Sequence, residues 1–191
     1  MTARERRPIE LLSLHDDLNS AGHAWHTDLL SFAVVPASGS TARVLGIPEG
    51  AAVYAIERLR SARNVPVALM RHEVPVSVVL FTREDLEQRG LYEILRSHDA
   101  EPRATSETIG ARAATVTEAR ILKESPGAAL LTMQRSAYDK HGMIVEYGRH
   151  VYRPSLCTFQ VTLTSSQVAY GNPLEAWTLP VSGFLSFRPF S

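Results

Sequence analysis

Apolar residues recur along this chain at spacings that divide it into short helices and strands. Helical spacing over residues 9–21, ended by Gly22, predicts an amphipathic helix. Elsewhere, alternation or short apolar runs bounded by glycine, proline or polar pairs predict strands. The predicted strands are residues 29–35, 53–62, 65–74, 103–113, 128–138, 143–153 and 158–163.

Short helices are predicted between these strands. Four are expected: residues 40–46, a segment from Thr82 to the break at Gly90, residues 91–97, and a helix capped by Thr117 that runs to about Lys123. Because hairpins alternate with short helices, the order predicts an α+β fold with a mostly antiparallel sheet.

Composition narrows the function classes. The chain has 20 basic and 20 acidic residues, which argues against direct binding to nucleic acid by this chain. A single cysteine, Cys157, excludes an internal disulfide framework. The polar start and the lack of a long apolar run predict a soluble, cytoplasmic protein with no membrane contact.

Two arginines give the first candidate binding group. On the strand from Val53, alternation places Arg58 and Arg60 on one face. Paired guanidinium groups match the oxygens of a carboxylate or phosphate. The alternative is that both arginines face solvent, balanced by Glu57 and Glu73, and spacing alone favours this alternative.

The strand over residues 143–153 gives the second candidate group. Its alternation places Glu146, Gly148, His150 and Tyr152 on one face. A carboxylate and a phenol among apolar residues could hold hydroxyl or amine groups of a ligand. Alternatively, Glu146 pairs with an arginine across the sheet, such as Arg135.

The sequence offers no metal or catalytic motif. The seven histidines show no HExxH spacing, and His23 and His26 lack acidic or cysteine neighbours, so a metal site is not expected. No nucleophile motif or phosphate-binding loop occurs. From spacing, Ser13 is a helix-surface residue. No cofactor is predicted, and no catalysis.

Several ordered motifs resemble a known family. They are Leu11-Leu12-Ser13-Leu14, Ile56-Glu57-Arg58-Leu59-Arg60, Val65-Pro66-Val67-Ala68, Leu91-Tyr92-Glu93-Ile94-Leu95, Glu107-Thr108-Ile109, Thr117–Leu122, Pro126–Leu131, Arg135–Asp139 and Glu146–Arg153. Together they resemble the UTRA domain, the effector-binding domain of GntR-type transcription regulators of the HutC subfamily. The resemblance covers residues 9–163, with 1–8 as a linker remnant. Residues 164–191 form a tail that either packs on the body, extends a dimer contact or is disordered, and the sequence does not choose between these.

The resemblance implies a chorismate-lyase-like fold with a ligand pocket between the sheet and the short helices that cover one face. Arg58, Arg60 and Ser13 would hold an anionic group, and Tyr92, Glu146 and Tyr152 would contact the rest of the effector. The expected effector is a phosphorylated or carboxylated small molecule.

Two positions depart from the pattern of amino-sugar sensors. Met70 stands where such sensors often have a glutamate, and Gly90 stands where they often have a serine. Both changes remove polar partners, so a less polar anion such as an organic acid fits better.

The resemblance further implies a homodimer that reaches operator DNA only through a winged helix-turn-helix, which is absent from this chain. The expected function is therefore effector sensing and dimerisation within a transcription regulator, often a repressor. Two alternatives are a chorismate-lyase-like enzyme and a partner without a DNA-binding head that forms heterodimers with an intact regulator. The sequence does not identify the effector.

Overall fold

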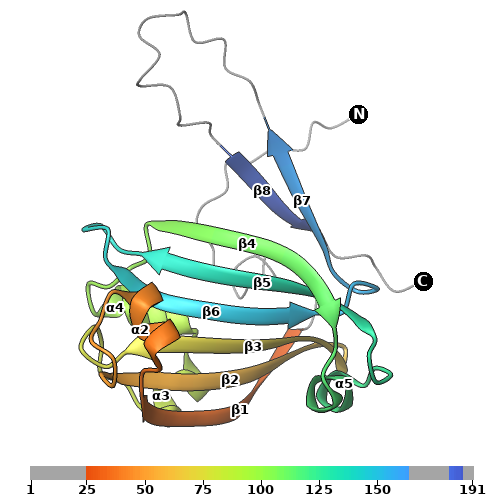
Figure 1. The fold of residues 1–191 in the computed structure, drawn as a ribbon, viewed down its shortest axis with the longest axis horizontal. Coiled ribbons are helices and arrows are strands. Elements are labelled where there is room, and N and C mark those ends of the chain that lie inside the picture. Colours follow the sequence, from red (N-terminus) through yellow and green to blue (C-terminus); the bar gives the residue numbers. More distant parts are fainter. Residues whose placement is uncertain (1–24, 164–180, 187–191) are drawn as a thin grey trace, which may run out of the picture.

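A six-stranded antiparallel sheet forms the centre of the computed structural model, which describes residues 25–163 and 181–186 (Figure 1). The strand order is β1-β2-β3-β6-β5-β4. The strands are β1 (Trp25–Pro36), β2 (Ala52–Ala62), β3 (Val65–Pro75), β4 (Ala104–Ala113), β5 (Ala129–Tyr138) and β6 (Ile144–Tyr152). This antiparallel sheet with few short helices confirms the predicted fold class.

A second, two-stranded antiparallel sheet pairs β7 (Thr158–Leu163) with β8 (Val181–Ser186). β7 was expected from the sequence. The structure adds β8 within the segment for which the sequence predicted none.

A tight turn and a register shift together set the pairing of the β2–β3 hairpin. Arg63 and Asn64 both have positive φ, 48° and 63°, as the two central residues of a type I′ turn do. The predicted turn at these two residues is thus confirmed. The register then shifts between Arg60 and Ser61, and beyond this shift Arg58 lies opposite Met70 and Ile56 opposite His72.

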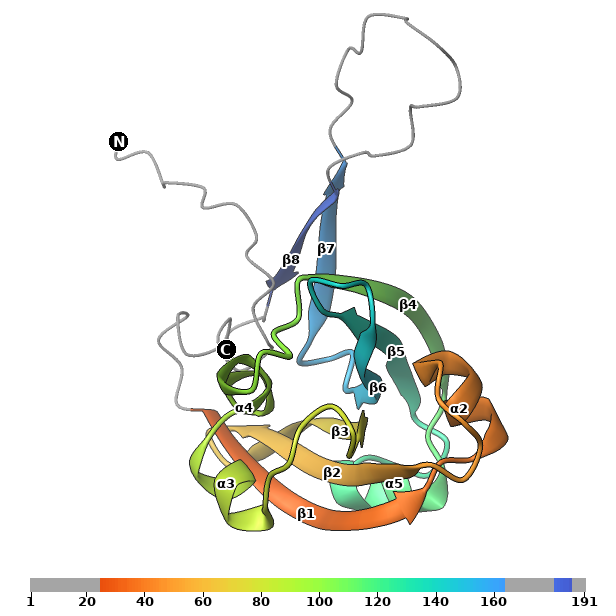
Figure 2. The same cartoon turned by 90° about the vertical axis from the view of Figure 1, so that its left-hand side faces the viewer.

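The helices lie on both faces of the curved sheet. α3 (Arg83–Gln88) and α4 (Leu91–Ser97) cover the inner face, which carries Ile56 and Glu146 (Figure 2). The helices α2 (Gly39–Leu45) and α5 (Val116–Leu122) lie on the outer face, which carries Arg71 and Glu73.

Local capping explains where α2 and α5 begin and end. Ser38, which lies before the predicted start at residue 40, caps α2. The helix ends at Gly46 in the left-handed region (φ 67°), the closing glycine that the sequence predicted. For α5 the prediction of Thr117 as cap was wrong, because Thr115 caps the helix. Thr115 and Glu118 form a reciprocal capping box, in which each side chain accepts from the backbone N–H of the other.

Apolar packing holds α3 and α4 against the inner face. Ile94 and Leu95 of α4 are fully buried, and they pack with residues of β2 and β3 in one core cluster. Three aromatic rings extend this cluster toward β1. The rings of Phe32 and Phe81 lie 5.4 Å and 4.3 Å from the ring of Tyr54.

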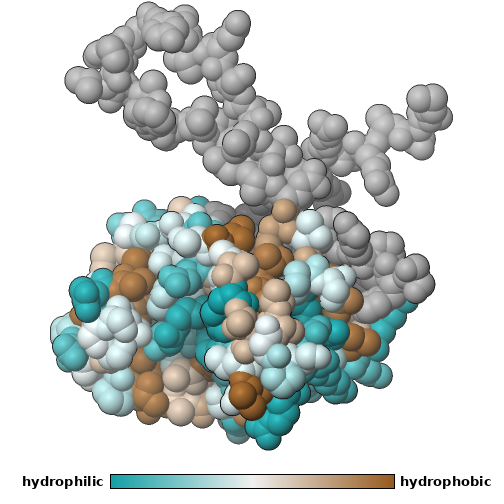
Figure 3. All heavy atoms as spheres, turned by 45° about the vertical axis from the view of Figure 1, so that its right-hand side comes forward, coloured by the Kyte–Doolittle hydropathy of each residue, from teal (hydrophilic) through white to brown (hydrophobic). Residues whose placement is uncertain are grey.

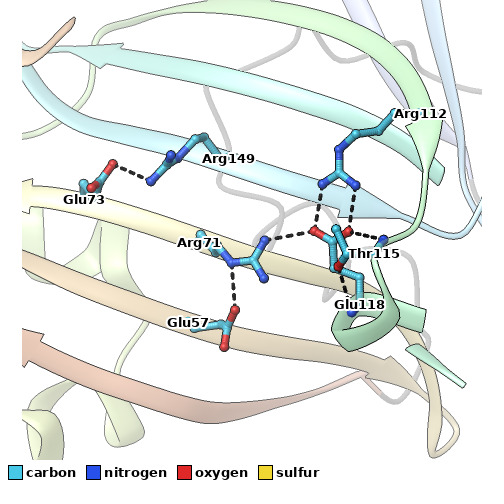
Figure 4. Close-up of polar contacts among 7 residues, drawn as sticks. All are labelled: Glu57, Arg71, Glu73, Arg112, Thr115, Glu118 and Arg149. Atoms are coloured by element: carbon cyan, nitrogen blue, oxygen red, sulfur yellow. Dashed lines mark hydrogen bonds and ion pairs between the residues drawn. The ribbon is translucent and has the colours of Figure 1, made fainter. Parts of the chain in front are cut away.

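Charged residues form a network on the outer face (Figure 4). The Glu118 carboxylate accepts hydrogen bonds from both Arg112 and Arg71, and Arg71 also donates to Glu57. The hydrogen bond from Arg112 is the main cause that holds the pKa of Glu118 well below its usual range. This network ties α5 to β2, β3 and β4.

The predicted helix over residues 9–21, the linker at 1–8 and the candidate Ser13 lie outside the described residues. Among the helices that the structure describes, none is long and apolar enough to cross a bilayer.

Candidate functional site

Five buried polar side chains meet on the inner face beneath α4. They are Arg58 of β2, His72 of β3, Tyr92 of α4, and Glu146 and His150 of β6, and they are called the inner cluster here. Each is at most 8% exposed, and Glu146 is fully buried. The residue types allow hydrogen bonding and charge in a region from which water is largely excluded.

A chain of hydrogen bonds runs through the inner cluster. Arg58 Nη2 lies 2.8 Å from His72 Nε2, and His72 Nδ1 lies 2.7 Å from Glu146 Oε1. A guanidinium group can only donate, so Nε2 of His72 accepts and its Nδ1 carries the proton that is donated to Glu146. The Tyr92 hydroxyl donates to the other carboxylate oxygen of Glu146 at 3.2 Å.

Burial shifts the ionisation of every member of the inner cluster. It lowers the pKa of Arg58 to about 10, a value at which the guanidinium stays charged at neutral pH. Burial, followed by the charge of Arg58, holds the pKa of His72 well below its ordinary value, and burial does the same for His150. Burial also raises the pKa of the Tyr92 phenol and of the Glu146 carboxyl. Both imidazoles are therefore neutral at neutral pH.

Some polar atoms of this region are buried without a hydrogen-bond partner among the described residues. They are Nε of Arg58, Nδ1 of His150 and Nε of the neighbouring Arg135. An unsatisfied buried polar group costs about 1–3 kcal/mol, more when it is charged. A ligand that supplied acceptor atoms would recover this free energy.

Two more arginines flank the inner cluster. Arg60 is 3% exposed and donates from Nε to the Thr27 hydroxyl of β1 at 3.3 Å. Arg135 of β5 forms an ion pair with Glu107 on β4. The inner face therefore brings three guanidinium groups from β2 and β5 into one neighbourhood.

Glycine at position 148 makes room for the inner cluster. A Cβ atom there would lie 2.5 Å from His150 Nε2 and 2.8 Å from Glu146 Oε1. The imidazole and the carboxylate therefore occupy the space above Gly148. Beyond His150, the ring of Tyr152 stands edge-on, with 6.3 Å between the ring centroids, and its hydroxyl contacts the sulfur of Met133.

The structure decides between the alternatives for the paired arginines. Arg58 and Arg60 are both buried, so the solvent-facing interpretation is wrong. The acidic residues proposed to balance them instead pair on the outer face, Glu57 with Arg71 and Glu73 with Arg149.

Glu146 hydrogen-bonds to His72 and Tyr92, whereas Arg135 forms its ion pair with Glu107. The charge of Arg135 nevertheless acts on the Glu146 carboxylate across the sheet, and favours its ionised form. Of the predicted site residues, the structure brings Arg58, Tyr92 and Glu146 into the inner cluster, and Arg60 and Tyr152 lie beside it.

Sequence reasoning missed His72 and named Arg135 only as a possible partner of Glu146. The turn alone would have placed His72 on the other face of the sheet. The register shift between Arg60 and Ser61 brings His72 opposite Ile56, and therefore diagonal to Arg58 on the same face. Arg135 lies opposite Gly148 on the neighbouring strand, a pairing that depends on the order of strands from distant parts of the chain.

His72, Glu146 and His150 also have the donor types of a metal site, and one ligand atom of each lies within 4.8 Å of the others. However, both nitrogens of His72 already have hydrogen-bond partners, and one of these partners is a guanidinium at 2.8 Å. A cation would have to displace those bonds beside a positive charge. These contacts favour an anion over a metal ion.

Comparison with known proteins places this site in context. The UTRA domain model matches residues 20–157. The chain is 28% identical over 151 residues to the HTH-type transcriptional repressor NagR of Bacillus subtilis, covering 78% of this chain and 62% of that protein. It is 25% identical over 165 residues to the repressor PhnF of Mycolicibacterium smegmatis, covering 86% and 68%. The chain thus matches about two thirds of the length of each of these two repressors.

Solved structures give the same picture. A transcriptional regulator from Streptomyces coelicolor is 35% identical, with a TM-score of 0.66, over 87% of this chain and 97% of that one. The effector domain of PhnF from Mycobacterium smegmatis shares the fold, with a TM-score of 0.68 at 24% identity, over 78% of this chain and 93% of that one.

Proposed function

Because this chain belongs to the UTRA domain family, we propose that its inner cluster binds an anionic metabolite and so informs a transcription regulator of the HutC type. The family match and the repressors among its relatives confirm the predicted resemblance to the UTRA domain of transcription regulators. Assignment to the HutC subfamily remains part of the proposal. They also confirm a ligand-sensing domain of a transcription regulator rather than the alternative enzyme.

The buried guanidinium of Arg58 carries the proposal. One of its nitrogens donates to His72 at 2.8 Å, while Nε is buried without a hydrogen-bond partner among the described residues. A charged donor in such surroundings binds an oxyanion strongly, because little water competes for it. Arg60, two residues along the same face, supplies a second guanidinium.

The surroundings of Arg58 favour a carboxylate attached to an apolar body. Met70 lies directly opposite both Arg58 and His150 in the sheet and is 5% exposed, so this wall of the cluster is a thioether. Gly90 begins α4 without a side-chain cap, so it adds no hydroxyl. The Glu146 carboxylate and the Tyr92 phenol would then hold a hydroxyl or amine of the effector. Tyr152 would pack against it, and Ser13 is proposed to contact its anionic group.

The same proposal extends to the whole regulator. We infer a homodimer whose operator contacts are made by a winged helix-turn-helix outside this chain, acting in the cytoplasm where the DNA lies. The formal charge of this chain is zero, which agrees with a sensing role rather than direct contact with DNA phosphates.

Thermal unfolding in the presence of candidate ligands tests the proposal. The panel contains mono- and dicarboxylic acids, sugar phosphates and an uncharged analogue of each. We expect the melting temperature to rise with one class of anions and not with the uncharged analogues. The rise should grow with the concentration of the anion above its dissociation constant. Equal stabilisation by charged and uncharged analogues would contradict an anion site.

A further inference from the structure

A guanidinium group stands at each end of the hydrogen-bonded chain in the inner cluster. At one end, Arg58 lies in hydrogen-bond contact with His72, which donates to Glu146. At the other end, Tyr92 donates to the second oxygen of Glu146. Burial raises the pKa of the Tyr92 phenol, and the Arg135 guanidinium opposes this rise through its charge and a hydrogen bond. The chain thus runs inward from two guanidinium groups to one carboxylate, both of whose oxygens already accept a hydrogen bond.

Arg135 reaches the cluster from the far side of the sheet. It lies opposite Gly148 of β6, and His72 of β3 lies opposite the same glycine on its other side. Residues that lie directly opposite one another share a face, so Arg135 and His72 are on the inner face together. Three strand spacings, about 14 Å of sheet, separate Arg135 on β5 from Arg58 on β2. Because residue 148 is a glycine, no side chain of that residue stands between Arg135 and the cluster.

Both of these guanidinium groups have an unmet donor. In Arg58 and in Arg135 alike, Nε is buried without a hydrogen-bond partner among the described residues. Nε and a terminal nitrogen of a guanidinium form a fork that matches the two oxygens of a carboxylate. The chain therefore leaves two separate positions for anionic groups, one at each end.

The ion pair of Arg135 with Glu107 does not use up its guanidinium. That pair is made through Nη2 of Arg135. On the outer face, one guanidinium takes two carboxylates at once, because Arg71 donates from Nε to Glu57 and from Nη1 to Glu118. Arg135 can take a second carboxylate at Nε in the same way.

Thioether side chains line the sheet between the two ends. Met70 of β3 and Met133 of β5 lie opposite His150 on its two sides, and they are 5% and 2% exposed. Met70 also lies opposite Arg58. Met133 precedes Arg135 by two residues on the same face of β5. Methionine side chains adapt to irregular apolar shapes, so this stretch suits an apolar spacer.

A small molecule fits these groups better than a macromolecule does. Arg58 is 8% exposed and the side chain of Arg135 is 16% exposed, so the unmet donors lie inside the domain. The side of the molecule shown in Figure 3 mixes polar and apolar residues and has no single continuous apolar area. That side therefore gives no indication of a large apolar partner.

We propose that the effector is a dicarboxylate, with one carboxylate at Nε of Arg58, the other at Nε of Arg135, and an apolar spacer against Met70 and Met133. This inference rests on the proposed function and names the class of ligand for the same site. It makes Arg135 the residue that distinguishes a dianion from a monoanion. It also gives Glu107 a role, because its carboxylate competes with the ligand for Arg135.

Calorimetric titration of the parent chain with matched ligands tests binding at two points. The ligands are succinate, glutarate, adipate and suberate, each beside its monoamide, and glycerol phosphate, which carries its charge at one end. We expect affinity to peak at one chain length, where the diacid binds at least about tenfold more tightly than its monoamide. Glycerol phosphate should bind no more tightly than that monoamide. Equal affinity of diacid and monoamide at every length, or tighter binding of glycerol phosphate than of every diacid, overturns the inference.

Two variants should change this preference in opposite directions. Arg135→Gln should bind diacid and monoamide equally, because the second carboxylate loses its donor. Glu107→Gln should bind the diacid more tightly than the parent chain does, because its amide no longer competes for Arg135. A folding defect does not produce such a gain. A preference that survives in Arg135→Gln, or the absence of a gain in Glu107→Gln, overturns the inference.

The matched control is Arg149→Gln, which removes a guanidinium that pairs with Glu73 on the outer face. It should keep the preference of the parent chain, and loss of the preference in this variant overturns the assignment to Arg135.

The same titrations separate this inference from the proposed function. If a monoanion binds through Arg58 and the second carboxylate of a diacid adds nothing, the sensing proposal stands and the dicarboxylate inference fails. If no anion binds to the parent chain, both fail.

Discussion

Arg58 and Glu146 belong to strands that flank β3, and the imidazole of His72 on β3 joins their side chains. The three groups act as one unit, because His72 can accept from Arg58 only while its other nitrogen donates to Glu146. Removal of one partner from a buried charged pair costs about 3–5 kcal/mol. A ligand oxyanion at Arg58 would add the acceptor that its Nε lacks.

Gly148→Ala tests the packing of this unit. The added Cβ would lie 2.5 Å from His150 Nε2, so the imidazole and Glu146 must move. We expect chemical denaturation to show a loss of about 1–3 kcal/mol in the free energy of unfolding. The control is Gly39→Ala, where the nearest group is the exposed carboxylate of Glu49 at 3.1 Å, which can move aside. Equal losses in both variants would contradict the account.

Stability between pH 7.5 and 5.5 tests the neutral histidines. Burial, then nearby charge, lowers the pKa of His72 and His150 well below the ordinary value of 6.5. The unfolded chain therefore binds protons near pH 6.5 that the folded chain does not bind. The two neutral histidines therefore contribute fully to the free energy of unfolding above that pH, and this contribution is lost as the pH drops below it. In thermal melts, His150→Gln should lose less stability over this range than the parent chain. A loss equal to that of the parent chain would argue that His150 is not buried in neutral form.

At the scale of elements, local patterns predicted most of the fold. Alternation and turn residues located β1 to β7 and the Arg63-Asn64 turn, because these signals act between neighbouring residues. The register shift between Arg60 and Ser61, which places His72 on the face of Arg58, was not predicted. The order in which distant strands meet is not local. That order places Arg135 beside the inner cluster and buries Arg58, which spacing alone had favoured as a surface residue.

The cap of α5 shows a local signal that sequence reasoning overlooked. Thr115 and Thr117 are both threonines near the helix start, but only Thr115 has a glutamate three residues later, which is the spacing of a capping box. Glu118 of this box also accepts hydrogen bonds from Arg71 and Arg112 (Figure 4).

Paired alanine variants test the position of this cap. Thr115→Ala should lower the free energy of unfolding by about 1 kcal/mol, because the Glu118 N–H loses its acceptor. Thr117→Ala changes an exposed residue within the helix and should stay within about 0.5 kcal/mol of the parent chain. Urea denaturation distinguishes them, and the reverse order would restore Thr117 as the cap.

At the scale of the whole molecule, the two faces of the sheet have separate roles. On the outer face, an ion pair between Arg71 and Glu118 ties α5 to the strands, and the Thr41 hydroxyl ties α2 to them by donating to Glu73, which also pairs with Arg149. The inner face encloses the polar cluster, and Arg135 beside this cluster forms an ion pair with Glu107 of the edge strand β4.

Calorimetric titration of an anion identified by the thermal panel tests the central claim most directly. The same anion is titrated into the parent chain, Arg58→Gln and Arg149→Gln. Arg149 is the matched control, because its guanidinium pairs with Glu73 on the outer face. We predict at least about tenfold weaker binding for Arg58→Gln, since a charged hydrogen bond is worth about 1.5–3 kcal/mol. Arg149→Gln should bind like the parent chain. Unchanged affinity in Arg58→Gln would contradict an anion site at the inner cluster.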